Sequence, residues 1–172
     1  MTKITANHLD RAAFVYIRQS TADQLLNNPE SRRRQYGLAD CARQLGWAAV
    51  EVIDDDLGRS GGGINRPGFE RLLAAICESR VGAVFIEASR LARNGRDWHT
   101  LIEFCGLVGT IIVDEDGVYD PRHPNDRLLL GMKGTMSELE LSLFRQRSQE
   151  ALKQKARRGA LFRKRCIIGP RR

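Results

Sequence analysis

The stretch Tyr16-Ile17-Arg18-Gln19-Ser20 places hydroxyl groups and a guanidinium group at the end of an apolar run. If residues 12–17 form a strand, Tyr16, Arg18 and Ser20 leave the backbone on the same side. A charged arginine in this setting needs a partner, and a phosphate group matches its planar fork. The stretch therefore indicates a phosphate site beside a serine. A structural alternative stays open, in which Tyr16 is a core aromatic residue, Arg18 pairs with a buried carboxylate and Ser20 forms an ordinary cap or turn.

Three further polar clusters follow apolar runs in the same way. Asp54-Asp55-Asp56 and the glycine-rich residues 58–63 follow the run 47–53, Ser89, Arg90 and Arg93 follow the run 81–86, and the acidic residues 114–116 follow the run 110–113. Helical patterns separate the runs, which predicts an α/β fold with a mostly parallel sheet of four to five strands flanked by helices. Because the carboxyl ends of parallel strands share one edge of the sheet, we expect the clusters to line one cleft.

Residues 124–158 predict one long helix, since after Pro124 the only breaker residues are Gly131 and Gly134. Its length would be about 50 Å at a rise of 1.5 Å per residue. Alternate spacings of three and four separate Leu129, Met132, Met136, Leu139 and Leu143, whereas Leu130, Leu141 and Phe144 lie elsewhere around the helix. A second apolar face suggests a partner helix from another subunit. The alternative is a helix that packs only on its own sheet.

Composition and charge limit the organisation of the chain. The 172 residues, 42% of them hydrophobic, suffice for one core and leave no room for a second domain of ordinary size. Residues 1–150 contain 19 Lys and Arg against 21 Asp and Glu, whereas residues 151–172 contain nine Lys and Arg and no acidic residue. The basic end favours contact with a polyanion there. A disordered, solubilising end is the alternative.

Several classes of site are excluded by missing motifs. The four cysteines are scattered, which suggests neither a zinc site nor a disulfide framework, and residues 114–117 are too short for a calcium loop and predict a turn. No apolar run reaches the ~18 residues that span a bilayer, and the N-terminus lacks the apolar region of a signal peptide. We expect a soluble, cytoplasmic protein that binds neither metal nor membrane.

The chemistry that remains is that of arginine and phosphate. No S-x-x-K motif follows Ser20, and the three histidines lie in no motif with an acid, so a hydrolase-type serine has no visible base. The phosphate-binding loop of nucleotide triphosphatases and the dinucleotide fingerprint are also missing. Arg18, Arg66, Arg90 and Arg93 are the side chains expected around a phosphoryl group during in-line displacement.

Together these residues carry a resemblance to a known family. The motifs are Tyr16-x-Arg18-x-Ser20-Thr21 with Gln24, Ser31-x-x-x-Gln35, Ser60 six residues before Arg66, Arg90-Leu91-x-Arg93, and a long helix with Glu138 and Arg145. In this order, over about residues 12–158, they resemble the catalytic domain of the serine recombinases, which comprise resolvases, invertases and large serine integrases. The resemblance implies site-specific strand exchange on double-stranded DNA and a place in a mobile element.

The resemblance also implies a mechanism and an assembly. Ser20 would attack a DNA phosphodiester and form a 5′-phosphoserine linkage, leaving a free 3′-hydroxyl. Since the phosphoester keeps the bond energy, religation would need no ATP, metal or other cofactor. The protein would form a homodimer, and a tetramer in the synaptic complex. Residues 1–123 would be the catalytic core, 124–158 the dimerisation helix, and 159–172 a basic, disordered tail.

Roles for single residues follow from the same resemblance. Arg18, Arg90 and Arg93 would bind and polarise the phosphate, and Arg66 would assist. The supporting residues would be Tyr16, Gln24, Gln35, Ser60, Ser89, Glu138 and Arg145. Contacts to DNA are expected from Lys153, Lys155, Arg157, Arg158, Arg163, Lys164 and Arg165.

Two departures from the family pattern matter. Many members have an aspartate where this chain has Ser89, so a role for a carboxylate at that position is open. A recombinase normally continues into a DNA-recognition domain, so we expect this chain to be a truncated protein or a gene remnant with weak or lost targeting. The alternative function is therefore a non-catalytic module that dimerises through the long helix and binds DNA without sequence specificity.

Overall fold

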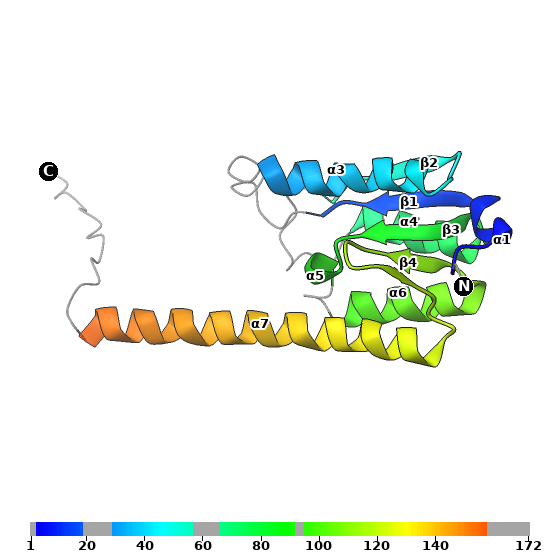
Figure 1. The fold of residues 1–172 in the computed structure, drawn as a ribbon. Coiled ribbons are helices and arrows are strands. Elements are labelled where there is room, and N and C mark those ends of the chain that lie inside the picture. Colours follow the sequence, from blue (N-terminus) through cyan, green and yellow to red (C-terminus); the bar gives the residue numbers. More distant parts are fainter. Residues whose placement is uncertain (1–2, 19–28, 57–65, 92–94, 158–172) are drawn as a thin grey trace, which may run out of the picture. The chain divides into compact units, whose positions relative to one another are not determined.

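The computed structural model describes residues 3–18, 29–56, 66–91 and 95–157 (Figure 1). The described residues form a five-stranded sheet in the order β2-β1-β3-β4-β5. Its strands are β1 (Ala12–Tyr16), β2 (Val50–Ile53), β3 (Val81–Ile86), β4 (Ile111–Val113) and β5 (Val118–Tyr119). The first four are parallel, and β5 runs antiparallel to β4. The predicted α/β fold with a mostly parallel sheet is confirmed.

The helices connect these strands and flank the sheet. They are α1 (Ala6–Leu9), α3 (Pro29–Gln44), α4 (Pro67–Cys77), α5 (Ala88–Leu91), α6 (Gly95–Val108) and α7 (Pro124–Arg157). The chain divides into two compact units, residues 1–138 and 139–172, and α7 contributes to both. The expected boundaries at residues 123 and 158 stay a prediction.

Alternation along β1 divides the core into two layers. Ala13, Val15 and Ile17 pack on one face of the sheet, in the layer that includes Ala42 of α3 and Trp47. Phe14 and Tyr16 pack on the other face, in the layer that includes Phe69 of α4 and Leu101 of α6. A strand buried on both faces is expected in a parallel sheet covered by helices. Tyr16 therefore faces the layer of α4 and α6.

The second strand is shorter than the run that predicted it. The run 47–53 is apolar apart from Glu51, but β2 begins at Val50. Trp47 precedes the strand, and its buried indole Nε1 donates a hydrogen bond to the carbonyl oxygen of His8 at 2.9 Å. Its ring also meets Phe85 edge to face, with 5.4 Å between centroids. Apolar character at Trp47 thus reflects core packing outside the strand.

The first half of α7 is fastened to the body of the protein. Leu130 is fully buried, and its carbonyl oxygen accepts a hydrogen bond from Trp98 Nε1 at 2.8 Å. Lys133 Nζ donates to Asp114 and Asp116, each at 2.6 Å. These aspartates belong to the turn between β4 and β5, which Asp114 closes by donating its N–H to the carbonyl of Gly117. The predicted long helix and the predicted turn are both present.

None of the described helices is long and apolar enough to span a membrane.

Candidate active site

Tyr16 stands at the carboxyl end of β1 with its hydroxyl group in the core. Only 1% of its surface is exposed, and its ring packs against Phe69 with 5.9 Å between ring centroids. The hydroxyl donates a hydrogen bond to Asp56 Oδ2 at 2.6 Å. Burial raises the pKa of Tyr16 far above its ordinary value, and the hydrogen bond to Asp56 adds to this. Tyr16 is therefore a permanent hydrogen-bond donor.

Asp56 joins the end of β1 to the start of α4. Its carboxylate is buried and accepts three hydrogen bonds, from Tyr16 and from the backbone N–H groups of Gly68 and Phe69 at 3.0 and 2.9 Å. These N–H groups belong to the first turn of α4, where backbone N–H groups have no acceptor within the helix. Asp56 thus caps the helix from a distance in the sequence. In the sequence, Asp56 stands out only as part of an acidic loop, because no local pattern links it to a helix start at Pro67.

Arg18 follows β1 and is half-buried. Burial lowers the pKa of its guanidinium group, the positive charge of Arg66 lowers it further, and Tyr16, Asp97 and Asp56 oppose the change. An arginine in a protein remains protonated despite such a shift, so the result is two like charges held near each other. Tyr16 and Arg18 thus face the same group of charged residues, as strand alternation predicted.

Arg66 stands directly before α4, where its carbonyl oxygen accepts the N–H of Glu70 at 2.9 Å. Its guanidinium Nη1 donates to Asp97 Oδ2 in the first turn of α6. Both side chains are largely buried, with 12% and 19% of their surface exposed. The ion pair therefore ties α4 to α6 beside Arg18.

Sheet topology places the other expected residues near the same edge. β1 lies between β2 and β3, and Tyr16 is paired in register with Ile86. After β1 the chain forms β2 on one side of it and then β3 on the other side. The strand order therefore reverses between β1 and β3, and ligands bind at such a switch point in open α/β sheets. Arg18 follows β1, and Ser89 and Arg90 lie on α5, which begins two residues after β3 (Figure 1).

The structure thus brings Tyr16, Arg18 and Arg66 together and adds Asp56 and Asp97 to them. Gln35 lies on α3, and Glu138, Arg145, Lys155 and Arg157 lie on α7, as does the exposed Lys153. Eight expected residues lie outside the described part of the chain: Ser20, Gln24, Ser60, Arg93, Arg158, Arg163, Lys164 and Arg165. Among the described residues, no group of three or more His, Cys, Asp or Glu could hold a metal ion.

Comparison with known proteins assigns the family. Residues 13–161 match the family described as "Resolvase, N terminal domain". The chain belongs to the resolvase family. The match to the resolvase N-terminal domain includes the five residues that the structure brings together, Tyr16, Arg18, Asp56, Arg66 and Asp97. It confirms the resemblance inferred from the sequence motifs.

Two solved structures and one curated sequence are similar to this resolvase-family chain. A resolvase family site-specific recombinase from Streptococcus pneumoniae is 25% identical, with a TM-score of 0.55, over 86% of this chain and 99% of that one. The N-terminal catalytic domain of TP901-1 integrase has the same fold, with 22% identity and a TM-score of 0.53, over 77% and 98%. An uncharacterised protein of Sinorhizobium fredii, y4bA/y4pH, is 52% identical over 163 residues. That alignment covers 92% of this chain but 24% of that protein, so the chain spans about a quarter of its relative.

Proposed function

We propose that the chain is the catalytic domain of a serine site-specific DNA recombinase. The Ser20 hydroxyl oxygen attacks a DNA phosphorus atom, the bond from phosphorus to the 3′ oxygen breaks, and a 5′-phosphoserine linkage forms. The hydroxyl proton passes to a base, and the leaving 3′ oxygen takes up a proton. Religation is the same exchange in reverse, with a 3′-hydroxyl from another strand as the nucleophile, and it consumes no cofactor.

The observation that carries the proposal is the cluster at the end of β1. Two arginines, Arg18 and Arg66, lie close enough for one charge to affect the other, and burial makes that repulsion costly. A phosphodiester bound between them would relieve the repulsion and accept hydrogen bonds from both. Such fixed cations stabilise charge that develops on phosphoryl oxygens. Arg90 and Arg93 are proposed to complete the site from the chain that follows β3.

Ser20 is proposed as the nucleophile because it lies two residues beyond Arg18, four beyond the ordered Tyr16. The supporting residues would be Gln24, Gln35, Ser60, Ser89, Glu138 and Arg145. Strand exchange requires several copies of the chain, so we propose a homodimer and, on paired DNA sites, a tetramer. The cations of residues 151–172 would contact the DNA backbone.

The test is a covalent trap on DNA. The protein is incubated with a pool of end-labelled DNA duplexes of randomised sequence, which together carry a nick near each possible cleavage point. Cleavage next to a nick releases a short DNA fragment, and the loss of that fragment prevents religation. Labelled DNA that stays attached to the denatured protein measures the phosphoserine linkage. The wild-type chain should form the adduct and Ser20→Ala should not. An equal yield from both proteins would rule out Ser20 as the nucleophile.

A second candidate function is a non-catalytic module that dimerises and binds DNA. The observation in its favour is the excess of nine cations without an acidic residue in residues 151–172. Binding of this kind would be insensitive to sequence and would weaken steeply with salt. It would also proceed without any covalent adduct, so the trap separates the two candidates.

A further inference from the structure

We propose that Asp97 is a positioning residue of the phosphate site and acts through Arg66. The inference rests on the proposed function, since it assumes that Arg66 faces a phosphodiester. Asp97 appears in none of the sequence motifs that identify the family, and its partner lies 31 positions away in the chain. The two residues meet because Arg66 stands before α4 and Asp97 lies in the first turn of α6.

Asp97 fixes the orientation of the planar guanidinium group of Arg66. A guanidinium carries five N–H donors in a rigid fork, so one fixed edge determines where the others point. Nη1 of Arg66 is held by Asp97 Oδ2, and both side chains are mostly buried. A second edge of the fork then has a fixed direction. Asp97 therefore orients Arg66 before any anion arrives, which is how a site avoids reorganisation during the reaction.

Asp97 also changes the balance of charge around Arg18. Arg18 is half-buried, and the nearby charge of Arg66 disfavours its protonated form, while the carboxylate of Asp97 favours it. Asp97 thus offsets part of the repulsion between two arginines that must share one site. Its negative charge also opposes an incoming phosphate. Removal of that charge should leave binding of DNA intact or tighter while the reaction becomes slower.

A purely structural role of Asp97 would have a different consequence. Asp97 lies in the first turn of α6, where a negative charge stabilises a helix. If that were its whole role, substitution would affect the protein equally with or without Arg66. A double-mutant cycle separates the two roles, because coupling vanishes when one partner is already removed.

The experiment measures adduct formation on the nicked duplexes and DNA affinity side by side. Asp97→Asn should slow adduct formation by about 10- to 100-fold, the cost of a misplaced catalytic group, with affinity unchanged or tighter. In the Arg66→Ala background the same substitution should change the rate by less than about twofold. Asp97→Glu should recover part of the rate. Asp40→Asn, which removes an exposed aspartate paired with Arg43 on α3, is the matched control and should have no effect.

An equal loss of rate in both backgrounds would overturn the proposal and leave the proposed function intact. The proposed function could also fail while the role of Asp97 holds, and this case needs a measurement that does not depend on DNA cleavage. The NMR signal of the Arg66 side-chain Nε–H, followed during titration with inorganic phosphate, is such a measurement. The signal should shift in the wild-type chain and shift less in Asp97→Asn. If it does so while no adduct ever forms, Asp97 is still the positioning residue and the proposed recombinase activity is wrong. If phosphate shifts the signal equally in both proteins, the positioning role is wrong.

Discussion

At the scale of single residues, the candidate site depends on two carboxylates that carry no motif of their own. Asp56 fixes Tyr16 to the start of α4, and Asp97 fixes Arg66 to α6. Each carboxylate joins two elements that are distant in the sequence. Arg66 therefore has a defined position, because Asp97 holds its guanidinium group against α6.

Asp56→Asn should destabilise the protein by about 2 kcal/mol, because the amide can accept at one position only. Whichever way the amide turns, its NH₂ group faces either the N–H of Gly68 or the N–H of Phe69, and a buried donor without an acceptor costs about 1–3 kcal/mol. Tyr16→Phe, which removes a single hydrogen bond, should cost about 1 kcal/mol. Urea unfolding measures both free energies. Equal values for the two variants would contradict the capping role of Asp56.

The sequence could predict the local part of this arrangement. Alternation along a strand is a local rule, and it is consistent with the action of Asp56 and Arg66 on both Tyr16 and Arg18. The partners Asp56 and Asp97 depend on how α4 and α6 pack, and no spacing in the chain records that packing. The acidic run at residues 54–56 is visible in the sequence. The sequence does not show that Asp56 is the buried member of the run. Residue types indicated the chemistry, and tertiary contacts determined the geometry.

At the scale of elements, the two glycines of α7 have different surroundings. A Cβ atom added at Gly134 would lie 2.6 Å from Trp98 Cδ1, whereas one added at Gly131 would meet nothing within 4 Å. Trp98 also donates to the carbonyl of Leu130, so the indole lies against the helix backbone. The sequence predicted the helix through both glycines but could not distinguish them, because the difference comes from α6.

Gly134→Ala should therefore destabilise the protein by about 1–3 kcal/mol, the range for overpacked sites. Gly131→Ala is the matched control on the same helix and should stabilise it by up to about 1 kcal/mol, since alanine is the better helix former. Thermal unfolding of both variants at one protein concentration provides the comparison. Destabilisation by both substitutions, or by neither, would mean that Trp98 does not set the distance between α6 and α7.

The amino-terminal end of the sheet contains a pH-sensitive element. His8 of α1 is buried, and its Nδ1 accepts the N–H of Thr5 at 3.1 Å. Burial lowers the pKa of His8, and the positive charges of Arg11 and Arg122 lower it further, although Asp120 opposes them. The unfolded chain then takes up the proton first, so the unfolding free energy should fall as the pH drops below the ordinary value of 6.5.

This loss should be smaller in His8→Gln, which cannot titrate. Unfolding curves between pH 7.5 and pH 5 test the difference, and His99→Gln serves as the control because His99 is exposed on α6. Parallel pH profiles for the wild-type chain and His8→Gln would show that His8 makes no contribution to acid sensitivity.

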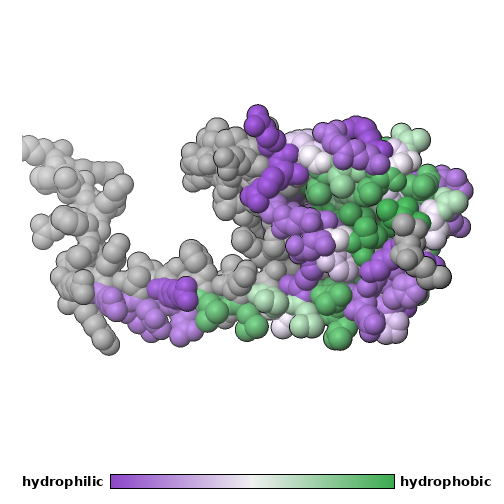
Figure 2. Space-filling view, in the orientation of Figure 1, coloured by the Kyte–Doolittle hydropathy of each residue, from purple (hydrophilic) through white to green (hydrophobic). Residues whose placement is uncertain are grey.

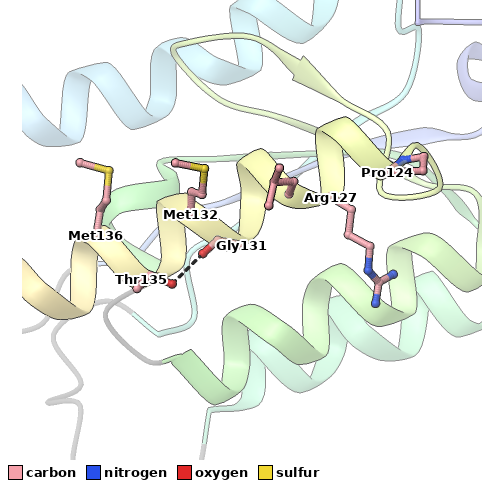
Figure 3. Close-up of a pocket in the computed structure, with 7 residues that line it drawn as sticks. Pro124, Arg127, Gly131, Met132, Thr135 and Met136 are labelled. Atoms are coloured by element: carbon pink, nitrogen blue, oxygen red, sulfur yellow. Dashed lines mark hydrogen bonds between the residues drawn. The ribbon is translucent and has the colours of Figure 1, made fainter.

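At the scale of the whole molecule, the unexplained feature is an apolar face on α7. Leu129, Met132, Met136, Leu139 and Leu143 form the row with alternate spacings of three and four, and between 48% and 60% of each is exposed. Leu130, off that face, is fully buried against the body. In the first compact unit the face borders a surface depression lined by Leu128, Gly131, Met132 and Met136, among others. Figure 3 shows both methionines projecting from the same side of α7, and Figure 2 shows hydrophobic residues along this helix.

We expect this face to be the contact between copies of the chain. Exposed apolar side chains in a continuous row mark an interaction surface, and burial of two methionines contributes about 1.5–3 kcal/mol each. Met132→Glu combined with Met136→Glu should therefore weaken self-association at least about 100-fold, the equivalent of about 3 kcal/mol. Sedimentation velocity over a range of concentrations measures the association. The matched control is Leu107→Glu on α6, which alters a leucine that is 80% exposed and off α7. If both variants associate like the wild-type chain, the row of leucines and methionines is not the interface, and self-association would need another contact surface.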